Sequence, residues 1–192
     1  VYFLHHTAVD QNSGKVKAKT VGKMIDQYLN ESSISMFGNT GVLNRAELES
    51  RCEVKWENYS LKLQIESRVL GDLVINHVLP AAKRYQKTLL EKVANVKQVF
   101  DADEANNLNE QDCLLIRRIE SHASAIIAGV DKMTERRVVA NHIENQRERA
   151  MAFHDTVVPL MEDIRKHVDE LEMWIDDQLW TLPKYRELLF IR

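Results

Sequence analysis

The sequence predicts a mainly α-helical protein: a long antiparallel helical hairpin or bundle with kinks near Pro80 and Pro159, preceded by a small irregular or β-containing N-terminal part. Only three prolines and six glycines occur in 192 residues, so few positions oppose long helices. Apolar residues recur at intervals of three to five positions over Leu61–Val96, Ile119–Met133 and Phe153–Ile175. This spacing is typical of helices that pack along one face.

The N-terminal part gives the weakest pattern. Val1–Leu4 is an apolar run of β-forming residues, which would suit a strand separated from its sheet. A helix is expected from about Lys15 to Asn30, and the glycines within Ser32–Gly41 predict a loop after it. The apolar face expected for that helix consists of Val21, Met24, Ile25 and Tyr28.

A long helix is predicted from Asn44 onward. Asn44 is a good N-cap and Glu47 follows three residues later, so the pair resembles a capping box that satisfies free backbone donors. Pro80 lacks a backbone N–H and crowds the preceding turn, which predicts a kink or break near His77 to Leu79. The expected apolar stripe comprises Leu61, Ile65, Val69, Leu73, Val78, Ala82, Tyr85, Leu89, Val93 and Val96.

The second half of the chain predicts the returning helices. The polar stretch Asp101–Asn109 is expected to connect two antiparallel helices. Within Lys132–Arg149 neither Gly nor Pro marks a turn, so a turn there cannot be positioned from the sequence. Pro159 predicts another kink, and a sharp stop is expected at Trp180 because residues near Pro183 avoid helical angles.

Composition excludes several functions. Twenty-six Lys and Arg against 29 Asp and Glu give a net charge of -3, and the two signs are interspersed, so no nucleic acid or anionic membrane partner is expected. No apolar run approaches the ~20 residues that span a bilayer, and no signal peptide is evident. Cys52 and Cys113 show no CxxC spacing, which favours core positions and a cytoplasmic location.

Two motifs carry a family resemblance. IESRVLGDL at Ile65–Leu73, followed by NHVLPAA at Asn76–Ala82 and by Tyr85–Gln86, resembles the central helix of the C-terminal domain of type III glutamine synthetases. VDELE at Val168–Glu172 and WTLPKYRELLF at Trp180–Phe190 resemble the C-terminus of that family. The two motifs lie in the family's order, about 100 residues apart, which is a specific combination.

The resemblance implies a helical C-terminal domain over residues 37–192, with residues 1–36 as a connector, an insertion or the edge of the preceding catalytic domain. It also implies that ATP and magnesium bind in that catalytic domain, and that this chain alone is inactive, with no catalytic, cofactor-binding or metal-binding residue of its own. The partners it implies are the rest of the subunit and further copies in stacked hexameric rings. Neither GxxxxGK[ST] nor GxGxxG occurs here.

The candidate site residues have structural interpretations first. We expect Gly71 to permit close helix approach, Pro80 to set the kink, Tyr85 to pack, and His77 to satisfy backbone carbonyls freed by the proline. The apolar ending predicts a docked tail, where each large buried side chain contributes roughly 1.5 to 3 kcal/mol. It could dock within the chain, on the catalytic domain or on a neighbouring subunit; its members are Trp180, Leu182, Pro183, Tyr185, Leu188, Leu189 and Phe190.

Two alternatives remain open from the sequence. An independent helical-bundle interaction or regulatory module with no catalytic activity would show the same apolar seams. A metal site is the other, since Asp163, His167 and Glu170 can share one helix face, although a solvated charged face is the more common outcome of this spacing.

Overall fold

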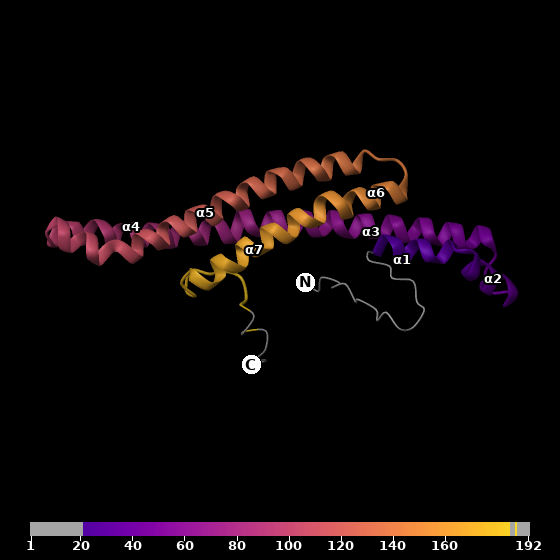
Figure 1. Cartoon of the computed structure of the whole chain (residues 1–192), viewed down its shortest axis with the longest axis horizontal. Coiled ribbons are helices and arrows are strands. Elements are labelled where there is room, and N and C mark those ends of the chain that lie inside the picture. Colours follow the sequence, from indigo (N-terminus) through magenta and orange to yellow (C-terminus); the bar gives the residue numbers. More distant parts are fainter. Residues whose placement is uncertain (1–20, 185–186, 188–192) are drawn as a thin grey trace. The chain divides into compact units, whose positions relative to one another are not determined.

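The computed structural model describes residues 21–184 and 187, which are mainly helical and contain no strand (Figure 1). The mainly α prediction is therefore confirmed, whereas Val1–Leu4 lies outside the described residues. The elements are α1 (Val21–Asp26), the 3-10 turn η1 (Gln27–Leu29), α2 (Glu31–Asn39), α3 (Arg45–Leu73), the π-helical segment η2 (Val74–Val78), α4 (Leu79–Val99), α5 (Ala102–Asn141), α6 (Gln146–Ala152), the π-helical segment η3 (Phe153–Val157) and α7 (Val158–Trp174).

The chain divides into two compact units. The first contains the residues up to Gln64 together with Val138–Asp155, and the second contains Ile65–Arg137 together with the residues from Thr156 onward. Helices α3 and α5 each supply residues to both units.

Helix α2 replaces the loop predicted over Ser32–Gly41. The Asn30 side chain caps the helix by accepting a 2.7 Å hydrogen bond from the Ser33 N–H. The two glycines mark only the end of the helix, where Gly41 adopts a φ of 64° that other residues rarely adopt. The prediction was wrong because a helix-terminating signal was assigned to the whole segment.

Helix α3 begins with the predicted capping box. The Asn44 Oδ1 atom accepts a 3.0 Å hydrogen bond from the Glu47 N–H, and the Glu47 carboxylate accepts one of 2.8 Å from the Asn44 N–H. Both donors would otherwise lack a partner at the start of a helix. This prediction is confirmed.

The buried face of α3 differs from the predicted stripe, because Leu61, Ile65 and Val69 are exposed. The buried face includes two serines, Ser60 and Ser67, which apolar periodicity does not detect. Ser60 is tolerated there because its hydroxyl donates to the Trp56 carbonyl at 3.0 Å, so the buried polar group is satisfied. The buried positions are Leu48, Cys52, Trp56, Ser60, Leu63, Ser67 and, in η2, Val74 and Val78.

The first unit has a small core of Ile25, Cys52, Trp56 and Ala150, with Tyr59 and Met151 packed against it. Of the face predicted for the first helix, Ile25 is buried, while Met24 and Tyr28 are exposed. Helix α6 enters this unit after a turn at residues 142–145. Its N-cap is Asn145, which accepts a 3.0 Å hydrogen bond from the Glu148 N–H and so positions the turn that the sequence left open.

Both prolines follow a π-helical segment of five residues, η2 before Pro80 and η3 before Pro159. In η2 the Leu79 N–H donates to the Val74 carbonyl, five residues back rather than four. The helix therefore continues past Pro80 with a locally widened turn, which begins slightly earlier than the kink predicted near His77 to Leu79.

In the second unit, α4 and α5 form the predicted antiparallel hairpin (Figure 1). A 2.7 Å ion pair between Lys92 and Asp112 joins the two helices, as does a 3.3 Å hydrogen bond from the buried Asn109 amide to the Val93 carbonyl. The connection is only Phe100 and Asp101, so the loop predicted over Asp101–Asn109 is wrong. Asp101 caps α5 instead, accepting hydrogen bonds from two backbone N–H groups of the first turn.

Helix α7 ends at Trp174, before the stop predicted at Trp180. Ile175 is extended, and Asp176 organises a turn in which its carboxylate accepts a 2.8 Å hydrogen bond from the Gln178 N–H. An Asp side chain that bonds nearby backbone groups competes with helix continuation. The stop was misplaced because the effect of Pro183 was considered and that of Asp176 was not.

Candidate docking groove

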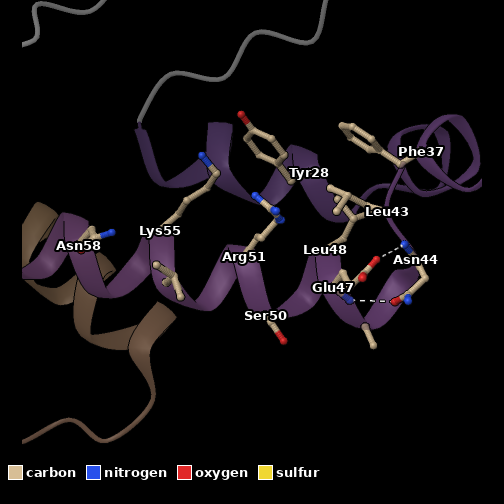
Figure 2. A pocket seen from close by; sticks show the side chains of 12 residues that line it. Tyr28, Phe37, Leu43, Asn44, Glu47, Leu48, Ser50, Arg51, Lys55 and Asn58 are labelled. Carbon is tan, nitrogen blue, oxygen red and sulfur yellow. Dashed lines mark hydrogen bonds between the residues drawn. The ribbon is translucent and has the colours of Figure 1, made fainter. Parts of the chain in front are cut away.

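An open groove of about 880 Å³ runs along the first turns of α3 in the first unit (Figure 2). Tyr28 and Phe37 lie on one side of it, and the Arg51 and Lys55 side chains point from α3 toward the same space (Figure 2). The apolar lining residues are Tyr28, Phe37, Leu43, Ala46, Leu48 and Val54.

The walls of the groove expose apolar side chains to solvent. Val54 is 54% exposed and Tyr28 is 40% exposed, whereas Leu48 is buried. Further exposed apolar residues of the first unit, outside the groove lining, are Met24, Leu29, Met36, Val42, Leu61, Val138 and Val139. Burying a large apolar side chain contributes about 1.5 to 3 kcal/mol, so this surface favours an apolar occupant.

Cationic side chains border the groove along α3. Arg51, Lys55 and Lys62 are four and seven positions apart, which places them on one helix face. The Lys55 ammonium lies 4.7 Å from the centre of the Tyr28 ring, and within the described part of the chain neither Arg51 nor Lys62 forms an ion pair. The acidic lining residue Glu47 is already engaged by the Asn44 backbone.

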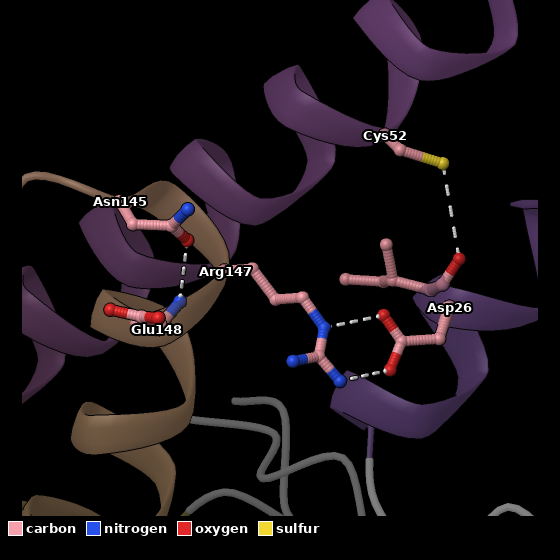
Figure 3. Close-up of polar contacts among 6 residues, drawn as sticks. Asp26, Cys52, Asn145, Arg147 and Glu148 are labelled. Carbon is pink, nitrogen blue, oxygen red and sulfur yellow. Dashed lines mark hydrogen bonds and ion pairs between the residues drawn. The ribbon is translucent and has the colours of Figure 1, made fainter.

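Polar contacts fix α1 beside α3 and α6 (Figure 3). Arg147 donates to both carboxylate oxygens of Asp26, at 2.8 and 2.7 Å, and this hydrogen bonding raises the pKa of the arginine above its ordinary value. The Cys52 thiol lies 3.9 Å from the Ile25 carbonyl, and burial raises its pKa. A protonated buried thiol is a poor nucleophile, in agreement with the predicted core role of Cys52.

The predicted glycine contact lies elsewhere in the second unit. A Cβ atom on Gly71 would meet Met133 and Val130 at 3.7 and 3.8 Å, which is ordinary van der Waals contact. A Cβ atom on Gly129 would lie 2.9 Å from Ile164 Cγ1, so the close approach between α5 and α7 occurs there. Sequence reasoning missed Gly129, although it is the one glycine within Ala102–Asn141.

His77 and Pro80 lie at the π-helical segment, and Tyr85 is half-buried on α4. The hydrogen bond that the structure gives His77 is not to a backbone carbonyl: its Nδ1 atom is 3.3 Å from the Thr181 hydroxyl. The predicted role of His77 is therefore replaced by a contact between η2 and the segment after α7.

The first part of the apolar ending packs within the chain. Trp180 is 8% exposed, and Lys184 ties the segment after it to α7 by donating to the Glu172 carbonyl at 2.9 Å and pairing with Asp177. Pro183 is exposed. The remaining tail residues predicted to dock lie outside the described residues; they are Tyr185, Leu188, Leu189 and Phe190.

The possible metal ligand His167 instead forms a histidine pair. Its Nδ1 atom is 2.9 Å from Nδ1 of His122 on α5, 45 residues away in the sequence. Burial lowers the pKa of His122, and His167 and Arg118 lower it further, whereas Glu170 opposes them. No three metal-ligating side chains converge anywhere in the described ranges. Over the same ranges, no helix combines the length and the apolar composition needed to cross a bilayer.

The hairpin and the shorter helices define a helical domain, and comparison with known proteins gives its family. Residues 11–97 match the family model described as the glutamine synthetase C-terminal domain. The chain is 46% identical over 172 residues to a glutamine synthetase of Bacteroides fragilis (strain YCH46), a match that covers 90% of this chain and 24% of the relative.

Two further relatives agree. A type-3 glutamine synthetase of Dictyostelium discoideum is 31% identical over 163 residues, with 84% of this chain and 22% of the relative covered. A glutamine synthetase of Butyrivibrio fibrisolvens is 24% identical over 177 residues, with 92% and 25% covered. The chain belongs to the glutamine synthetase family and corresponds to its C-terminal helical region, and the resemblance to the type III enzymes is confirmed. It spans about a quarter of the length of these relatives.

Proposed function

We propose that this chain is the C-terminal structural and assembly portion of a glutamine synthetase, a ligase that forms glutamine from glutamate and ammonia with ATP. The catalytic centre, with its ATP and magnesium, lies in the part of the parent protein outside this chain. The similarity to relatives named glutamine synthetase, of which this chain covers 24% in the Bacteroides fragilis protein, supports the proposal.

The observation that carries the assembly role is the open groove of the first unit. Its apolar side chains face solvent in this chain, whereas large exposed apolar surfaces in proteins usually mark contacts with other protein. In the longer parent protein, other protein segments cover this surface. Assembly into stacked hexameric rings in the cytoplasm is the arrangement that the family resemblance favours.

The test of the assembly role is Val54→Asp in the full-length protein. Val54 is 54% exposed here, so the carboxylate is tolerated in the isolated region but buried and unpaired once the groove is covered. We expect the assembled protein to dissociate, so that its mass under native conditions falls, and we expect glutamine formation to be lost. Val139→Asp is the matched control, because Val139 is 61% exposed in the same unit and does not line the groove. Unchanged mass and activity of Val54→Asp would contradict the role.

The ligase part of the proposal needs a second measurement. ATP-dependent glutamine formation is compared between the full-length protein and this 192-residue chain, in the presence of magnesium. Activity confined to the full-length protein is the expected result. Activity of the chain alone would place the catalytic centre here, and no activity of either would favour an independent helical interaction module.

A further inference from the structure

We infer that the groove of the first unit binds an acidic amphipathic segment of the same subunit, from the polypeptide that precedes this region. The inference rests on the proposed function, because it assumes that the groove is a packing surface, and it specifies what packs there.

The lining of the groove indicates that its occupant has an apolar face. Val54 and Tyr28 line the groove with exposed side chains, and the buried Leu48 also lines it. A smaller hollow of about 360 Å³, lined by Met24, Tyr28 and Lys62 among others, shares lining residues with the groove and extends it along α3. An extended groove with spaced apolar positions fits a segment whose apolar side chains recur on one face.

The positive charges of α3 indicate that the occupant is acidic. Arg51, Lys55 and Lys62 lie on one face beside the groove, and Glu47, the acidic residue in its lining, is held by the Asn44 backbone. Glu49, also on α3, is engaged as well, because it pairs with Arg45 at 3.1 Å. Three cations without carboxylate partners in the described residues complement carboxylates on the occupant, which fixes its orientation as well as its location.

The choice of the same subunit follows from covalent connection. The chain covers 24% of the Bacteroides fragilis relative, and the matched family model is a C-terminal domain, so most of the parent polypeptide lies before this region. Covalent connection keeps a segment of the same polypeptide near the groove, whereas a free partner must be captured from solution. The subunit's own polypeptide therefore occupies an open apolar groove first.

The experiment places a photocrosslinking amino acid at position 54 in the full-length assembled protein. We expect a product with the mass of a single subunit, in which the peptide containing position 54 is joined to an earlier peptide carrying both apolar and acidic residues. Glu53 is the matched control position, because it is exposed on the same helix but does not line the groove.

Each other outcome overturns the inference. A product with twice the subunit mass assigns the groove to a neighbouring copy, which refutes this inference while leaving the assembly role in place. A partner peptide without acidic residues refutes the charge argument. A crosslinking yield from position 54 that is no higher than the yield from position 53 would show that the groove stays open. The proposed assembly role would then lose its support as well.

Charge reversal tests the cations separately. We expect the double variant Arg51→Glu and Lys55→Glu to lower the crosslinking yield from position 54 by about tenfold. Lys97→Glu, on α4 in the second unit, is the control for added negative charge and should leave the yield unchanged. An unchanged yield in the double variant would show that the cations do not contribute to binding.

Discussion

Replacing Gly129 by Ala tests how α5 and α7 pack in the second unit. The added Cβ atom would lie 2.9 Å from Ile164 Cγ1, whereas carbon atoms prefer separations of about 3.5 to 4.0 Å. Ile164 is 1% exposed, and a β-branched side chain in a helix has one strongly preferred rotamer, so it cannot turn away. The two helices must separate locally instead.

The magnitude follows from two opposing effects. Overpacking a well-filled core costs about 1 to 3 kcal/mol, and Ala gains about 1 kcal/mol over Gly in a helix interior. A separation of 2.9 Å from a buried carbon is a severe clash, so the upper part of that range applies, about 2 to 3 kcal/mol, and the expected net loss of stability is about 1 to 2 kcal/mol. Gly71→Ala is the matched control, because its Cβ atom would meet Met133 and Val130 at 3.7 and 3.8 Å, so the helix propensity gain remains. Gly129→Ala is therefore expected to lower the free energy of unfolding, and Gly71→Ala is expected to raise it.

Hydrogen exchange of the full-length protein measures both effects locally. Peptides from α5 and α7 should exchange roughly 5 to 30 times faster in Gly129→Ala, and peptides around Gly71 should exchange no faster in Gly71→Ala. The penalty of Gly129→Ala should also shrink in an Ile164→Ala background, where the clashing atom is gone. Equal or better protection in Gly129→Ala, or strictly additive effects with Ile164→Ala, would refute the packing argument.

Two further predictions concern other parts of the chain. Asn44→Ala removes the cap that accepts the Glu47 N–H, so the first turn of α3 should lose about 1 kcal/mol, measured by hydrogen exchange, whereas Glu57→Ala at an exposed position of the same helix should change little. Because the pKa of His122 is lowered, the folded state favours the neutral ring. The contribution of His122 to the free energy of unfolding is fully present above the unfolded pKa of about 6.5, and it is lost as the pH falls through the lower folded pKa. Protection of α5 and α7 should thus fall on acidification, and His122→Gln should weaken that dependence. An unchanged pH dependence in His122→Gln would contradict the assignment to the pair of His122 and His167.

Local signals explain which parts of the fold could be predicted from the sequence. The capping box at Asn44 and the place of the irregular turn near Pro80 could be predicted from residues close together in the sequence, and the structure shows both. The prediction of a loop over Asp101–Asn109 was wrong because it relied on the polar composition of this segment and ignored Asp101 as a possible N-cap. Composition reports solvent exposure as much as secondary structure, so a polar helix start resembles a loop.

The candidate sites depended on contacts between distant residues, and these could not be predicted. His122 and His167 are 45 residues apart, and no periodicity within either helix indicates that their rings meet. The groove likewise depends on how η1 and α2 pack beside α3, and α2 was itself predicted as a loop. Buried Ser60 shows the same limit within one helix, because a hydroxyl that is satisfied by its own backbone can occupy a core position.

The π-helical segment before Pro80 raises the question of whether the proline or the surrounding packing maintains it. Pro80→Ala restores an N–H, and a regular α-helix could then form one more hydrogen bond, worth about 0.5 to 1.5 kcal/mol. Removing the extra residue of the π turn would, however, rotate α4 by about 100° about its axis. That rotation would expose buried residues of α4, which are Leu79, Ala81, Ala82, Leu89 and Val93.

Exposing the two leucines alone would cost about 3 to 6 kcal/mol, which exceeds the gain of one hydrogen bond. We therefore expect η2 to persist in Pro80→Ala, with the Leu79 N–H still protected by its bond to the Val74 carbonyl and exchange across α4 changed by less than about tenfold. Loss of protection at Leu79 together with faster exchange throughout α4 would show that the proline, and not the core, sets the register of the helix.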